Sequence, residues 1–182
     1  TDTEVVLEAI QYWGIKAINK FNGMFAIAIW NKSKKELLLV RDRLGIKPLY
    51  YSITNSGNII FASEIKALLE HPDVPKVINY KALDCYLKVD YIPGNRTIFK
   101  NVNKLQPAHY LTYKKGDINI VKYWSLRFTN EVRTVTSWMD ELEDQILSSV
   151  KARMIADVPI GAFLSGGIDS TIVLTAMARL SK

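Results

Sequence analysis

The spacing of hydrophobic residues changes near residue 125, and this change limits the folds that the chain can adopt. Up to residue 124, most apolar residues form short runs separated by polar and glycine-containing turns, a pattern that is typical of strands. After residue 134, apolar residues recur every three or four positions, which is typical of helices. The two patterns predict two domains, at 1–124 and 135–182, and a polar linker between them at 125–134.

The first of these domains is predicted to be α+β with an antiparallel sheet. Residues 1–20 have helical spacing, with a stop at Gly14 and a short second turn after it. Short links between strands imply antiparallel pairing, because parallel neighbours need a long crossover. Strands are expected at 24–30, 37–41, 49–53, 58–62, 108–113 and 118–124. Further helices are expected at 64–70 and 79–89, the second with Asn79 as its N-cap.

The part after the linker is predicted to begin a parallel α/β domain. A helix with one apolar face runs from Met139 to Met154, and Ser137 and Asp140 form its capping pair. Residues 159–164 have the composition of a short buried strand, and a second helix follows residue 170. A helix, a buried strand, a glycine-rich turn and a helix are the opening elements of such a domain.

Charge and composition indicate which partners to expect. The net charge is +6, but 24 basic residues are interleaved with 18 acidic ones, whereas a nucleic-acid binder concentrates basic residues on one face. No nucleic-acid partner is therefore expected. The longest apolar run, Met24–Trp30, is far shorter than the ~18 residues that cross a membrane. With no leader visible and one cysteine, Cys85, that cannot form an internal disulfide, we expect a cytoplasmic protein without a membrane partner.

The two ends of the chain predict a longer parent protein. The sequence begins at Thr1 without a methionine and stops at Lys182 inside an expected helix. Truncation is the simplest explanation of that end. The functional expectations below therefore refer to the parent.

The segment Phe163–Thr171, with the sequence FLSGGIDST, carries the clearest chemical signal. It lies at the start of an expected helix, where unpaired N–H groups and the helix dipole attract anions. Its two adjacent glycines allow positive φ and a close approach to a ligand. Asp169 would repel a bare phosphate, so a bridging cation such as Mg²⁺ is expected. The alternative is an ordinary turn in which Asp169 and Ser170 cap the helix.

The run Ser165–Ser170 resembles the pyrophosphate-binding loop (PP-loop) of ATP pyrophosphatases, which activate substrates as adenylates. The preceding run Asp157–Gly161, with Arg153 before it, is similar to the approach to that loop in glutamine-hydrolysing asparagine synthetases. Three earlier runs resemble the later part of that family's class II glutaminase domain, in the same order: Phe21–Ala26, Arg41–Tyr51 and Ala62–Leu68. The likeness covers nearly the whole chain, and the PP-loop narrows it from amidotransferases in general to the asparagine synthetase group.

What the resemblance implies is a ligase with two sites. Glutamine would be hydrolysed in the first domain, and ammonia would travel internally to the second. There aspartate and ATP would form aspartyl-AMP and pyrophosphate, and ammonia would displace AMP to give asparagine. The implied substrates are glutamine, aspartate and ATP, with Mg²⁺ as cofactor, and a homodimer is left open.

Two other readings remain. A related amidotransferase could act on another carboxylate acceptor, as in cell-surface polysaccharide clusters or β-lactam synthetases. The alternative from a different class of function is a basic binding module without enzymatic activity.

The resemblance assigns roles to residues of the second domain. Leu164 would border the nucleotide, and Asp169 would orient Mg²⁺. The residues that would hold the pyrophosphate are Ser165, Gly166, Gly167 and Ser170.

In the first domain, Asp2 aligns with the aspartate that binds the α-amino group of glutamine, and a helix N-cap is its alternative role. No catalytic residue is assigned, because the family's nucleophile is a cysteine at the mature N-terminus that this chain lacks. Cys85 is expected to be a packed thiol. Arg41 and Asp42 are explained without catalysis, as a buried ion pair that braces the turn into Gly45.

Overall fold

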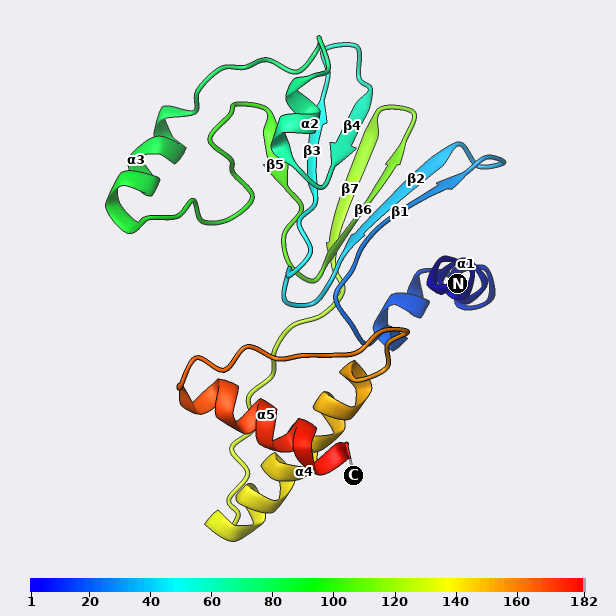
Figure 1. Cartoon of the computed structure of the whole chain (residues 1–182). Helices are drawn as coiled ribbons and strands as arrows, with labels where there is room; N and C mark the ends of the chain where they lie inside the picture. The colour runs from blue at the N-terminus through cyan, green and yellow to red at the C-terminus, as the bar shows by residue number, and fades with distance from the viewer. Residues whose placement is uncertain (182) are drawn as a thin grey trace. The chain divides into compact units, whose positions relative to one another are not determined.

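The computed structural model describes residues 1–181. They form two compact units, 1–127 and 128–181. The first unit combines helices with antiparallel sheets, and the second contains two helices (Figure 1). The predicted α+β class of the first part is confirmed. No helix or strand lies between Tyr123 and Thr134, while the predicted bounds of the linker stay a prediction. No helix in this described part is both long and apolar enough to span a lipid bilayer.

The chain begins with helix α1 (Asp2–Trp13), followed by the short 3₁₀ helix η1 (Gly14–Lys20). Thr1 is the N-cap, because its side chain accepts a hydrogen bond from the Glu4 N–H while the Glu4 carboxylate accepts one from the Thr1 amino group. This reciprocal pair satisfies two donors at the helix start. The capping role that was the alternative for Asp2 therefore belongs to Thr1. The predicted stop at Gly14, which has φ 61°, is confirmed.

Two antiparallel sheets follow in place of the single sheet expected. Their strand orders are β1-β2-β6-β7 and β4-β3-β5. The strands are β1 (Ala26–Asn31), β2 (Glu36–Arg41), β3 (Tyr50–Ile53), β4 (Ile59–Ala62), β5 (Val102–Lys104), β6 (His109–Lys114) and β7 (Asp117–Lys122). The second edge of β2 pairs with β6, so the chain passes to the other sheet between β2 and β3. The short strand β5, which has only one apolar residue, was not predicted.

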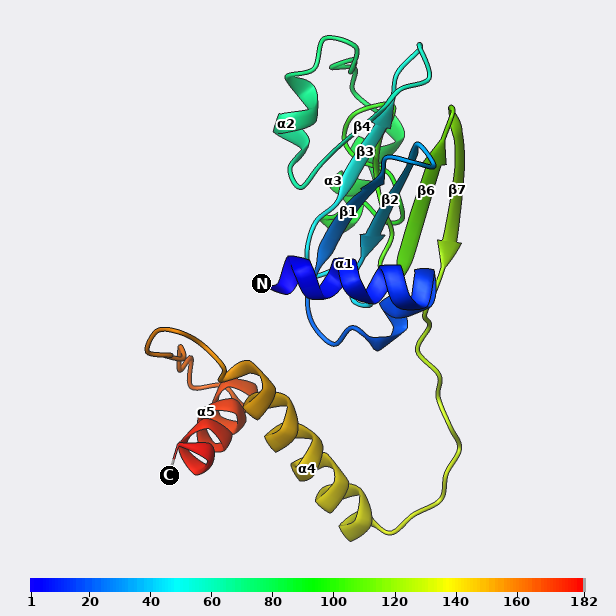
Figure 2. The ribbon, with the colours of Figure 1, turned by 90° about the vertical axis from the view of Figure 1, so that its right-hand side faces the viewer.

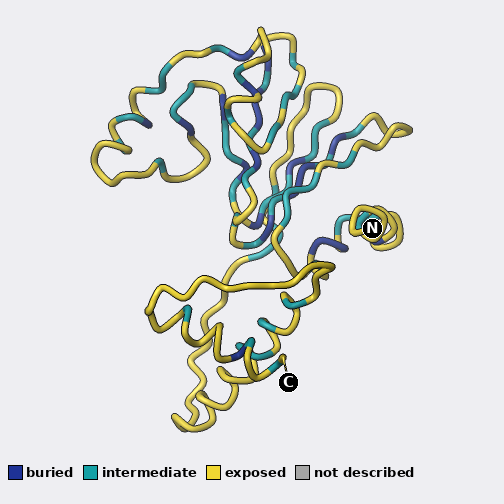
Figure 3. The backbone as a smooth tube through the Cα atoms, in the orientation of Figure 1, coloured by how far each residue is buried: buried dark blue, intermediate teal, exposed yellow. Residues whose placement is uncertain are grey.

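The core lies where the two sheets pack against each other (Figure 2). It is formed by residues from both sheets and their connections: Leu37, Leu39, Leu49, Tyr51, Leu105 and Leu111. The buried segments drawn in dark blue in Figure 3 follow these strands. A second cluster of Leu68, Val74 and Val102 packs beneath helix α2 (Ile65–Leu69). Helix α3 (Tyr80–Val89) is capped as predicted by Asn79, which accepts from the Ala82 N–H.

The second unit contains α4 (Val135–Arg153) and α5 (Ile168–Leu180). Two expectations about it were wrong. Thr134 caps α4 by accepting from the Ser137 N–H at 3.2 Å, so Ser137 and Asp140 are not the capping pair. Residues 159–164 are exposed and form no strand. A parallel strand needs neighbours to pair with, and none is present in the described part of this unit.

Candidate functional site

The loop between β2 and β3 is organised around the carboxylate of Asp42. This side chain is only 2% exposed. One of its oxygens accepts from the N–H groups of Leu44 (3.1 Å) and Ile46 (3.0 Å). The other accepts from Lys47 (2.9 Å) and from Phe25 (3.3 Å), which precedes β1. One buried anion therefore folds the loop and fastens it to a neighbouring strand.

These hydrogen bonds also decide the charge state of Asp42. Burial by itself would raise the pKa of the carboxyl, because it disfavours the charged form. The backbone N–H groups of the loop and of Phe25 outweigh burial, and the pKa lies below its ordinary value. The carboxylate thus remains ionised inside the unit.

Arg41 braces the same loop through backbone carbonyl groups. Its guanidinium donates to the carbonyl oxygens of Gly45 (2.6 Å), Lys47 (2.9 Å) and Leu105 (2.7 Å). Burial lowers the pKa of Arg41, and the charges of Tyr50 and Asp42 act against this. Arg41 and Asp42 do brace the turn, but each bonds to backbone groups and they do not form the predicted ion pair.

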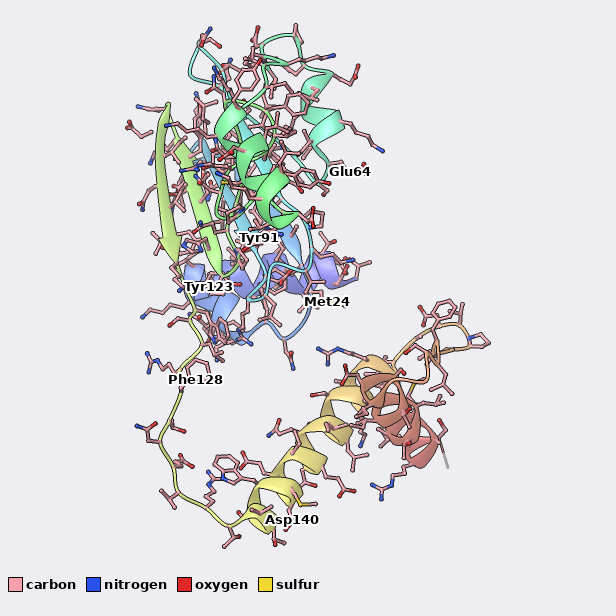
Figure 4. The ribbon with its side chains drawn as sticks, turned by 90° about the vertical axis from the view of Figure 1, so that its left-hand side faces the viewer. Met24, Glu64, Tyr91, Tyr123, Phe128 and Asp140 are labelled. Atoms are coloured by element: carbon pink, nitrogen blue, oxygen red, sulfur yellow. The ribbon has the colours of Figure 1, made fainter. Side chains whose placement is uncertain are left out.

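A cleft of about 970 Å³ opens beside this loop within the first unit. The start of α1 forms one side of it, and residues 20–29, the end of the loop and Ser63 form the rest. Met24, one of its lining residues, is labelled in Figure 4. Its lining includes Asp2, Phe25, Lys47 and Pro48.

Asp2 lies at this cleft, on the first turn of α1. Its Oδ1 accepts from the Thr3 N–H at 2.8 Å, whereas Oδ2 has no hydrogen-bond donor among residues 1–181. The side chain is exposed. An exposed carboxylate oxygen beside a cleft can accept a hydrogen bond from an ammonium group, so the arrangement fits the predicted amino-group site.

The predicted pyrophosphate loop is a turn held closed by its hydroxyl groups. Gly166 has φ 81°, and Gly167 is the N-cap of α5. The Ser165 and Ser170 hydroxyl oxygens lie 3.0 Å apart, and Ser170 also donates to the Gly167 carbonyl at 3.0 Å. Thr171 Oγ1 donates to the same carbonyl at 2.9 Å. These bonds keep the turn folded in the absence of a strand before it.

The backbone donors at the start of α5 remain open. Gly167 N donates over 3.4 Å to Ser165 Oγ. The N–H groups of Ile168, Asp169 and Ser170 have no acceptor within the described chain. Open N–H groups at a helix start form a site where anions bind favourably. Leu164 beside them is 58% exposed and free to contact a ligand.

A metal ion at this loop would depend on a bound phosphate. Among the described residues no three His, Cys, Asp or Glu side chains gather into a metal site. Asp169 is a single exposed carboxylate, and Mg²⁺ is commonly held by one or two carboxylates together with substrate phosphates. The donor set therefore fits Mg²⁺ bound with a nucleotide, and not a metal bound by protein alone.

The other reactive side chains lie away from the cleft. Cys85 is half-buried on α3 and does not line it. His71 and His109 each bond locally to backbone, at Asp73 N–H (3.2 Å) and Pro107 carbonyl (2.7 Å). These contacts agree with structural roles.

Sequence reasoning missed Tyr123, which is tied to the Asp42 loop. Its hydroxyl donates to the Arg41 carbonyl at 2.8 Å, across 82 positions in the chain. Burial, with the charge of Asp42, raises the pKa of Tyr123 to about 12, so the hydroxyl stays a donor at neutral pH. No local pattern marks this residue, because its only signal is a long-range contact.

Two families match the chain, each over one part. The family described as "Glutamine amidotransferase domain" matches residues 1–124, and the one described as "Asparagine synthase" matches residues 141–182. These ranges lie on either side of the segment without regular structure.

Named relatives extend over nearly the whole chain. Asparagine synthetase [glutamine-hydrolyzing] 3 of Bacillus subtilis is 35% identical over 98% of this chain and 29% of its own length. A putative asparagine synthetase [glutamine-hydrolyzing] 2 of Methanocaldococcus jannaschii is 37% identical over 100% and 36%. Amidase chyE of Penicillium rubens is 32% identical over 100% and 27%. The chain thus spans about a third of the length of these curated relatives.

Proposed function

Since the chain belongs to the glutamine amidotransferase domain family, we propose that it works within a longer protein as part of a glutamine-hydrolysing asparagine synthetase. The overall reaction would convert aspartate, ATP, glutamine and water into asparagine, AMP, pyrophosphate and glutamate. Ammonia released from glutamine in the first unit would be used at the second.

The observation that carries this proposal is the pairing of two matches on one chain. A glutamine amidotransferase match is followed within 17 residues by an asparagine synthase match, which begins at Glu141. The loop with open N–H groups at the start of α5 falls inside the second match. A protein with a glutamine site and an anion site in this order is suited to transfer nitrogen to an ATP-activated carboxylate.

In the first unit, the cleft would bind glutamine. The open oxygen of Asp2 would accept a hydrogen bond from the α-amino group, and the Asp42 loop would hold Lys47 and Pro48 in place as one wall. The nucleophile would come from a part of the longer protein outside residues 1–182, because Cys85 does not line the cleft.

In the second unit, the start of α5 would hold the pyrophosphate part of ATP. The N–H groups of residues 168–170 would donate to phosphate oxygens, and the helix dipole would stabilise their charge. The hydroxyls of Ser165 and Ser170 would exchange the bonds that close the turn for bonds to phosphate oxygens. Asp169 would hold Mg²⁺ with the phosphate oxygens, and the ion would neutralise charge that develops on the leaving pyrophosphate. Leu164 would contact the nucleotide.

The proposal is tested by following the amide nitrogen in the longer protein. With ¹⁵N-amide glutamine, aspartate and ATP, we expect ¹⁵N-asparagine together with equal amounts of AMP and pyrophosphate. Ser170→Ala should slow AMP formation about tenfold or more, the loss of one interaction with developing charge, while glutamine hydrolysis without ATP continues. Formation of ADP and phosphate in place of AMP would contradict the proposal.

One observation favours a nitrogen acceptor other than aspartate. Two of the relatives are named amidases, at 31% and 32% identity, and not asparagine synthetases. If AMP and pyrophosphate form only when aspartate is replaced by another carboxylic acid, the acceptor differs while the two-site chemistry stands.

A further inference from the structure

The end of β7 is fastened to the loop that forms one wall of the cleft. The Tyr123 hydroxyl donates to the Arg41 carbonyl at 2.8 Å, and the Tyr123 N–H donates to the Ala108 carbonyl at 2.8 Å. Ala108 in turn donates its own N–H to the Asp42 carbonyl at 2.9 Å. Figure 4 shows Tyr123 where the chain leaves β7. Tyr123 is thus held directly at Arg41 and, through Ala108, at the backbone of Asp42.

The next residue, Trp124, is held by the same loop. The Arg43 guanidinium lies 6.0 Å from the centre of its ring, a distance that permits a cation–π contact. Arg43 also donates to the Asn19 carbonyl of η1 at 2.7 Å. Arg41 and Arg43, on either side of Asp42, therefore hold two successive residues of the departing chain.

Beyond these two residues the chain is untethered. Residues 125–130 make no hydrogen bond within the described chain, and they have no regular structure. Phe128, labelled in Figure 4, lies on this stretch. The chain is fastened again at Arg133, which pairs with Glu131 and Glu141 and lies 4.6 Å from the Trp138 ring centre.

The wall of the cleft and this untethered stretch are joined by one rigid path. The backbone N–H of Lys47, in the wall, donates a hydrogen bond to the Asp42 carboxylate. The backbone carbonyl of Arg41, the residue before Asp42, accepts a hydrogen bond from the Tyr123 hydroxyl. Each step is a part-buried hydrogen bond, and close-packed interiors transmit strain, so a shift of the wall has a physical route to Tyr123.

We propose that Tyr123 is a positioning residue that couples the wall of the cleft to the segment joining the two units. A change in the cleft would alter how firmly the start of that segment is held. The use of this coupling in nitrogen transfer rests on the proposed function, whereas the coupling itself is a property of the chain and is tested on the chain alone.

Limited trypsin digestion measures the coupling. Arg127 lies in the untethered stretch and is exposed, and the exposed Lys115 in the β6–β7 turn serves as an internal reference for overall unfolding. Tyr123→Phe should raise the ratio of cleavage at Arg127 to cleavage at Lys115 about fivefold, the effect of one net hydrogen bond on local opening.

Tyr113→Phe is the matched control. Its hydroxyl also donates to a distant backbone carbonyl, that of Gly57 at 2.7 Å, but at another place between the sheets. This variant removes the same kind of bond and should leave the cleavage ratio unchanged. An equal rise in both variants would show that Tyr123 only stabilises the unit, and would overturn the proposal.

Changes in the cleft wall complete the test. Pro48→Ala and Asp42→Asn should each raise the cleavage ratio in the wild-type background and have no further effect in Tyr123→Phe, because the link is already broken. Pro48→Ala is the milder change and serves if Asp42→Asn does not fold. Equal effects in the two backgrounds would show that the wall does not act through Tyr123. Neither outcome depends on glutamine hydrolysis, so failure here is distinct from failure of the proposed function.

Discussion

Among single residues, Asp42 contributes most to holding the cleft wall. Four backbone N–H groups donate to its buried carboxylate. Asp42→Asn puts an amide N–H₂ against some of those donors, so several hydrogen bonds are lost at once. We expect the free energy of unfolding to fall by about 3 kcal/mol at pH 7, measured by urea denaturation. Asp117→Asn, at an exposed position of β7, should change it by less than about 0.5 kcal/mol.

The same residue predicts how stability depends on pH. The pKa of Asp42 is lower in the folded chain than its ordinary value of about 3.9. Its contribution is therefore complete above that ordinary value and is lost as the pH falls through the lowered folded pKa. Urea midpoints taken from pH 7 down to pH 3 should fall more steeply for the wild type than for Asp42→Asn. Parallel curves for the two proteins would contradict this assignment.

Gly45 is required in the loop for two reasons, which can be separated. Its φ is +68°, and an added Cβ would lie 2.6 Å from Pro107 Cγ. Gly116 has φ +92° but nothing within 4 Å of an added Cβ. Gly116→Ala should cost about 1 kcal/mol from backbone strain alone, and Gly45→Ala about 2–3 kcal/mol because the clash adds to that strain. Equal losses in thermal or urea unfolding would mean that Pro107 moves aside freely.

At the scale of elements, β1 is an edge strand, part of which lines the cleft. It pairs with β2 on one side only within the described chain, and its sequence AIAIWN has no charged residue. The opposite edge strand, β7, carries Asp117 and Lys122. Edge strands without charges are templates for pairing with another chain.

We therefore expect the 182-residue chain to self-associate through β1. Ala28→Lys places a charge at an exposed position of β1 and should shift the chain toward monomer in size-exclusion chromatography with light scattering. Asn119→Lys, at an exposed position of β7, is the control and should leave the distribution unchanged. A monomeric wild-type chain at about 100 μM would contradict the expectation, since edge pairing in this range is weak but measurable.

At the scale of the whole molecule, the proposed function would place parts of two sites on this chain, with no cysteine at the described part of the cleft. No cysteine is among the residues that line it, and a cysteine thiolate is the group that would attack the glutamine amide. We expect the purified chain to release no glutamate from glutamine above the uncatalysed rate, measured in a coupled glutamate dehydrogenase assay. Glutamate release that is lost in Cys85→Ser would show that Cys85 acts after all.

Local sequence patterns were sufficient to predict most helices and strands. Asn79 and Gly14 were predicted as helix cap and helix stop, because capping needs only neighbouring residues. Most strand positions followed from runs of apolar residues. The predicted strand at 159–164 was wrong because its formation depends on partner strands, which the apolar run itself cannot supply. The roles of Asp2 and of residues 164–170 stay predictions, although their exposure and open hydrogen-bonding groups are compatible with them.

The sequence by itself determined where most helices and turns lie, which family the motifs resemble, and that a glycine-rich turn precedes the last helix. Only the tertiary structure decided that the strands divide into two sheets, that Arg41 and Asp42 bond to separate backbone groups, and that Tyr123 reaches Arg41. The physical reason is the separation along the chain of the groups that interact. Caps and periodicity act over a few residues, whereas sheet partners and buried hydrogen bonds join segments as far apart as 82 positions, and local spacing carries no record of them.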